Sequence, residues 1–115
     1  MRMGRHILAL ATTMLVAGWS SQPLAATPSG EVIAHQGDGS APACTGCHGP
    51  AFQGNPAIKA PALAGLASSF ILARLAHYAS PAGHNPTMRA VAQALTPADR
   101  QAVAQYLSTL PKAPN

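Results

Sequence analysis

The sequence predicts a compact all-α domain of about four short helices, and three features support this fold class. Apolar residues in the second half of the chain recur with the period of a helix. Gly and Pro residues separate these periodic segments, as they do between helices. No stretch shows the strict alternation of apolar and polar residues that is typical of a half-buried strand.

Residues 1–26 are predicted to form a secretory signal peptide. After a basic start, the apolar run from Ile7 to Trp19 covers 13 positions, fewer than the ~20 that span a bilayer. The small-residue end Leu24-Ala25-Ala26 favours cleavage after Ala26, which leaves residues 27–115 as the mature domain. Because Leu24 stands at the −3 position, where a small residue is usual, an uncleaved N-terminal anchor is the alternative.

The first helix of the mature domain is expected at residues 28–36. Thr27 would cap it, Pro28 would occupy its first turn and Gly37 would end it. Val32 and Ile33 are the apolar contribution of this helix. A turn-rich segment, residues 38–42, leads to the next motif.

The pentapeptide Cys44-Thr45-Gly46-Cys47-His48 contains both cysteines of the chain and has the spacing of c-type haem attachment. On one helical turn, residues i, i+3 and i+4 share a face. The two thiols would therefore reach the two vinyl groups of a haem while His48 faces the iron. A single motif predicts one haem c, bound covalently through two thioethers.

Three other interpretations of the cysteines compete with haem attachment. A structural zinc site needs four ligands, and His35, His77 and His84 supply no second closely spaced pair. A thioredoxin-type redox pair requires a βαβ context, which the alanine-rich helical flanks do not offer. A plain disulfide leaves the histidine of the motif unexplained. The five-residue motif therefore favours haem.

Residues 49–67 are rich in Gly and Pro, so they are expected to be irregular backbone wrapped along one face of the haem. From Ser68 to about Ser80 the pattern becomes helical, with Ser68 or Ser69 as the cap. The expected stripe on this helix consists of Phe70, Ile71, Arg74, Leu75 and Tyr78.

A second Gly/Pro loop, residues 81–86, is expected to lead to Met88 and a short helical piece from Arg89 to about Ala94. The last helix has the clearest signals, with Thr96 as the N-cap and Pro97 at the first position. Its apolar face, which runs until Pro111, consists of Val103, Tyr106, Leu107 and Leu110.

The ligand opposite His48 decides whether the iron serves electron transfer or ligand chemistry. The other three methionines lie in the predicted signal, so Met88 is the only methionine of the mature domain. It follows a loop that must return toward the haem, which favours a ligand over a core residue. His77 and His84 are the competitors for this position.

Charge gives no reason to expect nucleic-acid binding. Removing the signal takes away Arg2 and Arg5 and leaves five basic and three acidic residues, a formal charge of +2. Two haem propionates would bring this close to zero. The basic residues are dispersed rather than clustered, at Lys59, Arg74, Arg89, Arg100 and Lys112.

The mature chain resembles the small bacterial class I monohaem cytochromes c. The resemblance rests on the motif Cys44–His48, on Pro61-Ala62-Leu63-Ala64-Gly65, and on Met88 ahead of the capped last helix. It implies a compact cytochrome c fold wrapped around one covalently attached haem, in which the first and last helices cross. It also implies that His48 and Met88 ligate the iron, and that the Pro61 carbonyl orients His48.

The sequence departs from this family pattern at two places. Leu66 stands where many relatives carry a glutamine, and the loop Gly83-His84-Asn85 lacks the arginine often found before the methionine. These departures leave the ligands intact and change the residues expected near the haem propionates.

The resemblance implies a soluble periplasmic one-electron carrier, not an enzyme, that exchanges electrons with redox partner proteins. Export fits covalent haem attachment in an oxidising compartment. After signal cleavage, no membrane-spanning segment is expected. Two alternatives stay open: a small haem c subunit of a periplasmic dehydrogenase complex, and a five-coordinate haem protein that binds a small ligand.

Overall fold

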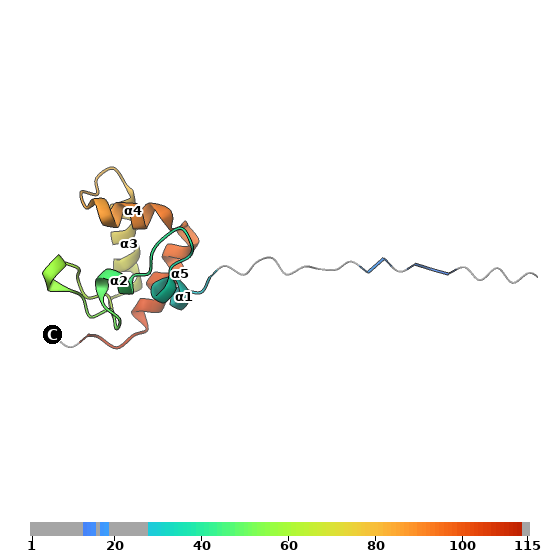
Figure 1. Cartoon of the computed structure of the whole chain (residues 1–115), viewed down its shortest axis with the longest axis horizontal. Coiled ribbons are helices and arrows are strands. Elements are labelled where there is room, and N and C mark those ends of the chain that lie inside the picture. Colours follow the sequence, from blue (N-terminus) through green and yellow to red (C-terminus); the bar gives the residue numbers. More distant parts are fainter. Residues whose placement is uncertain (1–12, 16, 19–27, 114–115) are drawn as a thin grey trace, which may run out of the picture.

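The computed structural model describes residues 13–15, 17–18 and 28–113, and its folded part is all-α (Figure 1). The rest of the predicted signal, and Thr27, lie outside the described residues. The helices are α1 (Gly30–Gln36), α2 (Thr45–His48), α3 (Ser68–Ala79), α4 (Pro86–Ala94) and α5 (Pro97–Ser108), with a 3₁₀ turn at Pro56–Ile58. The all-α prediction is confirmed, and α2, the turn of the haem motif, brings the number of α-helices within the described residues to five.

Strand structure in the described part of the chain is limited to one antiparallel bridge between Asn55 and Ala60. None of the described helices combines the length and the apolar composition that a bilayer crossing requires.

The cap of the last helix is the one that the sequence predicts. The Thr96 hydroxyl accepts a hydrogen bond from the Asp99 N–H at 3.1 Å, and Pro97 takes the first helical position. The carboxylate of Asp99, which is buried, lies in the first turn, where the helix dipole favours a negative charge.

The starts of α1 and α3 differ from the prediction. Ser29 caps α1 by accepting from the Val32 N–H, so Pro28 lies before the helix rather than in its first turn. Helix α3 begins at Ser68, but the cap position belongs to Ala67, and no side chain caps the helix there. Packing against the core holds these short helices more than their caps do.

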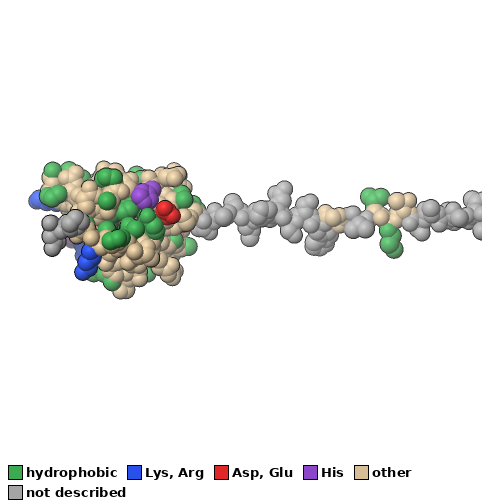
Figure 2. Space-filling model, turned by 90° about the horizontal axis from the view of Figure 1, so that it is seen from below, with side chains coloured by type: hydrophobic (Ala, Val, Ile, Leu, Met, Phe, Trp, Pro, Cys, Tyr) green, Lys and Arg blue, Asp and Glu red, His purple; other side chains and the backbone are tan. Residues whose placement is uncertain are grey.

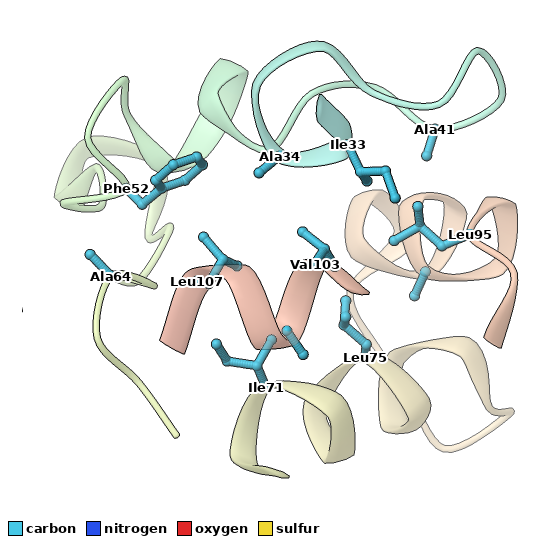
Figure 3. Packing of buried hydrophobic residues seen from close by; sticks show 12 residues of the cluster. Ile33, Ala34, Ala41, Phe52, Ala64, Ile71, Leu75, Leu95, Val103 and Leu107 are labelled. Carbon is cyan, nitrogen blue, oxygen red and sulfur yellow. The ribbon is translucent and has the colours of Figure 1, made fainter. Parts of the chain in front are cut away.

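Helix α5 lies at the centre of the core (Figure 3). Val103, Ala104 and Leu107 are each no more than 2% exposed. In Figure 3 the side chains of α3 approach α5 from one side and those of α1 from the other. The buried neighbours from other segments are Ile33, Ala34, Ala41, Phe52, Ala64, Ile71, Leu75, Ala92 and Leu95. Of the predicted α3 stripe, Ile71 and Leu75 are buried, whereas Phe70 is 55% exposed.

Helices α1 and α5 pack directly on each other, and Gly30 allows their close approach. A Cβ atom at Gly30 would collide with the Ala102 carbonyl and would lie 2.9 Å from Tyr106 Cβ. The two helices are also joined by a hydrogen bond of 3.1 Å between His35 Nε2 and the Tyr106 hydroxyl. The expected crossing of the first and last helices is therefore present.

Candidate haem-binding site

The haem motif forms a single helical turn. The His48 N–H donates to the Cys44 carbonyl at 2.9 Å, which closes the turn and places both cysteines and the histidine on it. The Cys44 N–H donates to the Ala34 carbonyl at 3.0 Å and so ties the motif to α1. Both thiols are free. The motif is thus held at one end by the first helix of the core.

The two thiols have different surroundings. Cys47 is exposed, whereas Cys44 is partly buried and packs against the hydrophobic core. Burial raises the pKa of the Cys44 thiol, because an apolar environment disfavours the thiolate. Addition of either thiol across a vinyl group would form a thioether without net oxidation or reduction, so both cysteines of the motif are competent for attachment.

His48 is 6% exposed, and its Nδ1 atom lies 2.8 Å from the Pro61 carbonyl oxygen. Since a carbonyl oxygen only accepts, Nδ1 must carry the proton of the neutral ring. The Nε2 atom is then left with a free lone pair, as a metal ligand requires. The hydrogen bond to Pro61 fixes both the tautomer and the orientation of the ring.

The segment between His48 and Pro61 is irregular, as predicted, but it is held by backbone hydrogen bonds. The Phe52 side chain is buried in the core, and its carbonyl accepts from the N–H groups of Leu63 and Ala64 at 2.9 and 3.2 Å. Phe52 has a φ of 56°, which is unusual for a residue with a side chain. This buried anchor brings the Pro61 segment back to the motif.

A tight turn completes the return of the chain. The bridge between Asn55 and Ala60 consists of two backbone hydrogen bonds, of 2.8 and 3.0 Å. Just before it, the Gly54 N–H donates to the His48 carbonyl at 2.7 Å. Gly54 has a φ of 87°, and a Cβ atom there would lie 2.7 Å from the Ala62 nitrogen. Only glycine fits this close approach of two backbone segments.

Met88 lies in the first turn of α4, partly buried and packed against the same hydrophobic core as Cys44. The prediction of a helix from Arg89 was wrong at its start, because the helix begins at Pro86. The Asn85 side chain caps it by accepting from the Met88 N–H at 3.0 Å. The pair Asn85-Pro86 repeats the cap-then-proline signal of the last helix, and this signal could have located the start.

Within residues 28–113, the histidines other than His48 lie at the surface. His77, on α3, and His84, between α3 and α4, are both exposed. His35 is bonded to Tyr106 and packs edge-on against Phe52, with the ring centroids 5.1 Å apart. Among residues 28–113, no group of three His, Cys, Asp or Glu side chains is placed to hold a metal ion. These residues therefore offer no set of ligands for the structural zinc site that was considered as an alternative to haem.

Comparison with known families identifies the fold that surrounds this site. The family model for cytochrome c matches residues 37–111, which includes the motif, Pro61 and Met88. The chain belongs to the cytochrome c family.

The proteins similar to this cytochrome c include a thiosulfate dehydrogenase electron acceptor, a thiosulfate dehydrogenase and a cytochrome c4. The chain is 39% identical over 70 residues to the thiosulfate dehydrogenase electron acceptor of Thiomonas intermedia (strain K12). The aligned region covers 61% of this chain and 32% of that protein. The structure of thiosulfate dehydrogenase TsdBA from Marichromatium purpuratum, in its as-isolated form, matches with a TM-score of 0.71 and 34% identity. That match covers 75% of this chain and 19% of the other.

Cytochrome c4 of Acidithiobacillus ferrooxidans is also similar, with a TM-score of 0.65 and 35% identity over 70% of this chain and 48% of the other. This cytochrome c spans about a third of the length of the curated relatives that it matches.

Membership of the family means that the chain carries covalently bound haem c, and the residues present fit that group. Cys44 and Cys47 lie on one turn with His48, and the His48 ring has its Nε2 lone pair free. Bound haem c supplies an iron that changes between two oxidation states. The protein's part is to hold that iron, set its ligands and exclude water.

Figure 2 shows a surface of this cytochrome c on which charged side chains are few and separated by uncharged ones. The described basic residues are scattered over several elements, as the sequence indicates, and no basic cluster forms on that face. A partner that meets such a surface does so with little long-range electrostatic attraction.

Proposed function

We propose that this cytochrome c is a periplasmic one-electron carrier whose haem iron is held between His48 and Met88. The observation that carries the proposal is the 2.8 Å hydrogen bond between His48 Nδ1 and the Pro61 carbonyl, which directs Nε2 to a metal. Met88 packs on the same core as Cys44, whereas His77 and His84 are exposed. The thioether is thus favoured as the second ligand.

Ligation by a histidine and a methionine fills both axial positions of the iron and raises its reduction potential. With no open position at the iron for a substrate, the natural task is the transfer of single electrons rather than catalysis. Redox proteins are the expected partners. The relative from Thiomonas intermedia, an electron acceptor by name, supports this class of function.

The proposal is tested with the Met88→Ala holoprotein. The wild-type ferric protein should show the weak long-wavelength band that arises from sulfur-to-iron charge transfer, and the variant should lose it. The potential should fall by roughly a tenth of a volt or more, within the ~0.8 V range that axial ligands control. The matched variants His77→Ala and His84→Ala should change neither the charge-transfer band nor the reduction potential. An absent band in the wild type, with Met88→Ala unchanged, would favour bis-histidine or five-coordinate iron.

A second candidate is a small haem subunit of a dehydrogenase complex. The similarity to a chain of thiosulfate dehydrogenase that is several times longer favours it. Size-exclusion chromatography of the protein from its native source separates the candidates. A free carrier elutes at the size of one chain, and a subunit elutes with a larger partner that carries dehydrogenase activity.

Periplasmic location is proposed from the signal-like residues 1–26 together with covalent haem attachment, which belongs to an oxidising compartment. N-terminal sequencing of the purified holoprotein should begin at Thr27. A start upstream of the apolar run, with the protein in the membrane fraction, would show that the segment is kept as an anchor.

A further inference from the structure

Side chains from α4 hold the last residue of α3 and the connection that follows it, residues 80–85. The Arg89 Nη2 atom donates to the Pro81 carbonyl at 3.2 Å and also to the Gly83 carbonyl. One turn further along α4, the Gln93 amide donates to the Ala79 carbonyl at 3.2 Å. Residues 89 and 93 are four apart and share a face of the helix. This face of α4 therefore fastens the preceding segment to the helix.

Arg89 is placed as an internal clamp. It is partly buried, and its Nε atom is buried without a partner among the protein atoms of the described residues. Its Nη2 atom is committed to two backbone carbonyls of the connection. A charged donor bonded to carbonyls stabilises more than a neutral donor does. The arginine thus fixes the path of the chain immediately before Met88.

The clamped path separates two side chains that are able to bind iron. Met88 is partly buried and packs against the hydrophobic core. His84, four residues earlier, is exposed and lines a surface cleft of about 350 Å³ together with Arg89 and Gln93. A looser connection would allow the first turn of α4 to open, and Met88 would then no longer be held in place while the His84 side chain is free at the surface.

We infer that Arg89 is a positioning residue that holds the 80–85 connection so that Met88, and not His84, is presented to the haem iron. This inference rests on the proposed ligation by Met88. The sequence offers no local signal for it, because the residues that Arg89 binds lie six and eight positions away in a loop.

The test measures how readily added imidazole displaces sulfur in the ferric holoprotein. Imidazole binds only when the turn that carries Met88 opens, so its apparent affinity reports the open fraction. Arg89→Gln should bind imidazole about tenfold more tightly than the wild type, because two charge-assisted hydrogen bonds are lost. Arg89→Lys keeps the charge without the planar fork, and should show a smaller increase.

Arg74→Gln is the matched control. Arg74 is exposed and bonds only within α3, to the Tyr78 hydroxyl at 3.0 Å, so the change removes the same charge and leaves the connection untouched. Its imidazole affinity should equal that of the wild type. A second readout without imidazole compares Arg89→Gln with the double variant Arg89→Gln/His84→Ala. The sulfur-to-iron band should weaken in the first and recover in the second.

Two results overturn the inference. One is an imidazole affinity for Arg89→Gln equal to that of the wild type and of Arg74→Gln, in proteins with the same far-UV circular dichroism. The other is a band that stays weak when His84 is removed, which excludes His84 as the competing ligand. If Arg89→Gln yields no holoprotein, an imidazole affinity of Arg89→Lys equal to that of the wild type also overturns the inference. A wild-type ferric protein without the sulfur-to-iron band would instead contradict the proposed ligation by Met88, and this outcome is distinct from the two above.

Discussion

The two sides of the haem site are built in different ways. On the His48 side, the ligand belongs to a single turn that is tied to α1, and a carbonyl 13 residues away fixes its ring. On the Met88 side, the proposed ligand lies near the start of α4, a short helix whose first turn depends on Asn85 and on the segment before it. The histidine is therefore set by local geometry and the methionine by the packing of a whole segment.

This difference predicts two kinds of failure. Changes on the His48 side should disturb haem attachment and the fold together, since the loop after the motif is anchored in the core through Phe52. If Met88 is the second ligand, as proposed, changes on its side should alter the ligand of the iron while most of the fold persists, because short segments at helix ends open locally at low cost.

The largest effect is expected from removing both thioethers. The double variant Cys44→Ser/Cys47→Ser should contain no covalent haem and lose most of its helical signal, since a domain of this size buries a limited apolar core. Mass spectrometry and thermal melts followed by circular dichroism measure both. Single variants, each with one thioether, should be intermediate. Cooperative melting of the double variant close to the wild-type temperature would show that the core suffices without haem.

Gly54→Ala should disturb the His48 side next most strongly. The added Cβ atom meets the Ala62 nitrogen, and φ at this position is 87°, so the free energy of unfolding should fall by about 1–3 kcal/mol. Gly39→Ala is the control, because φ there is 91° with nothing within 4 Å of the Cβ position. Both variants place a side chain at a positive φ, but only Gly54→Ala adds a steric collision. Denaturant unfolding of both holoproteins therefore separates the cost of the collision from the cost of the backbone strain. Equal losses of stability would mean that the close approach at Gly54 is unimportant.

Asn85→Ala should affect the Met88 side more mildly. Loss of a helix cap costs about 1 kcal/mol, and here the capped N–H is that of Met88 itself. The sulfur-to-iron band should weaken on heating before the helices melt, and Asn85→Asp should restore it. Thr96→Ala removes the equivalent cap of α5 and should lower stability without changing that band. If Asn85→Ala and Thr96→Ala weaken the sulfur-to-iron band equally, the cap of α4 has no particular effect on the position of Met88.

The smallest effect concerns Asp38, which lies outside both sides. Hydrogen bonds from the Ala41 and Ser40 N–H groups, at 2.6 and 2.8 Å, lower the pKa of this carboxyl. Its contribution to stability is therefore present above its ordinary pKa of about 3.9 and is lost as the pH falls through the lower folded value. Asp38→Ala should lower the melting temperature by less than about 4 °C at pH 7. The difference from wild type should shrink as the pH falls below the ordinary pKa of the carboxyl, and a difference that stays constant with pH would show that the ionised Asp38 carboxylate does not stabilise the fold.

The parts of the site that were predictable from the sequence are those with local causes. The motif spacing locates Cys44, Cys47 and His48, and the Thr96-Pro97 signal locates the start of α5. The Pro61 contact came from a family resemblance, and the hydrogen bond is present in the structure.

Other features depend on segments that meet only in the folded chain. The approach of Gly30 to the Ala102 carbonyl and the clamp formed by Arg89 have no local signal. Phe52 takes a left-handed backbone conformation because the core receives its ring, which a propensity argument does not anticipate. Phe70 belongs to the predicted stripe by period but is exposed, because the position of α5 decides which face of α3 is covered.

The central claim, that Met88 ligates the iron opposite His48, is tested most directly by the position of one methyl signal. In reduced, diamagnetic protein labelled with ¹³C at the methionine methyl groups, a methyl held over the haem face is shifted far upfield by the ring current. Ligation by Met88 predicts one such signal, absent from Met88→Leu. A Met88 methyl signal at the ordinary position of an unligated methionine would show that Met88 does not bind the iron.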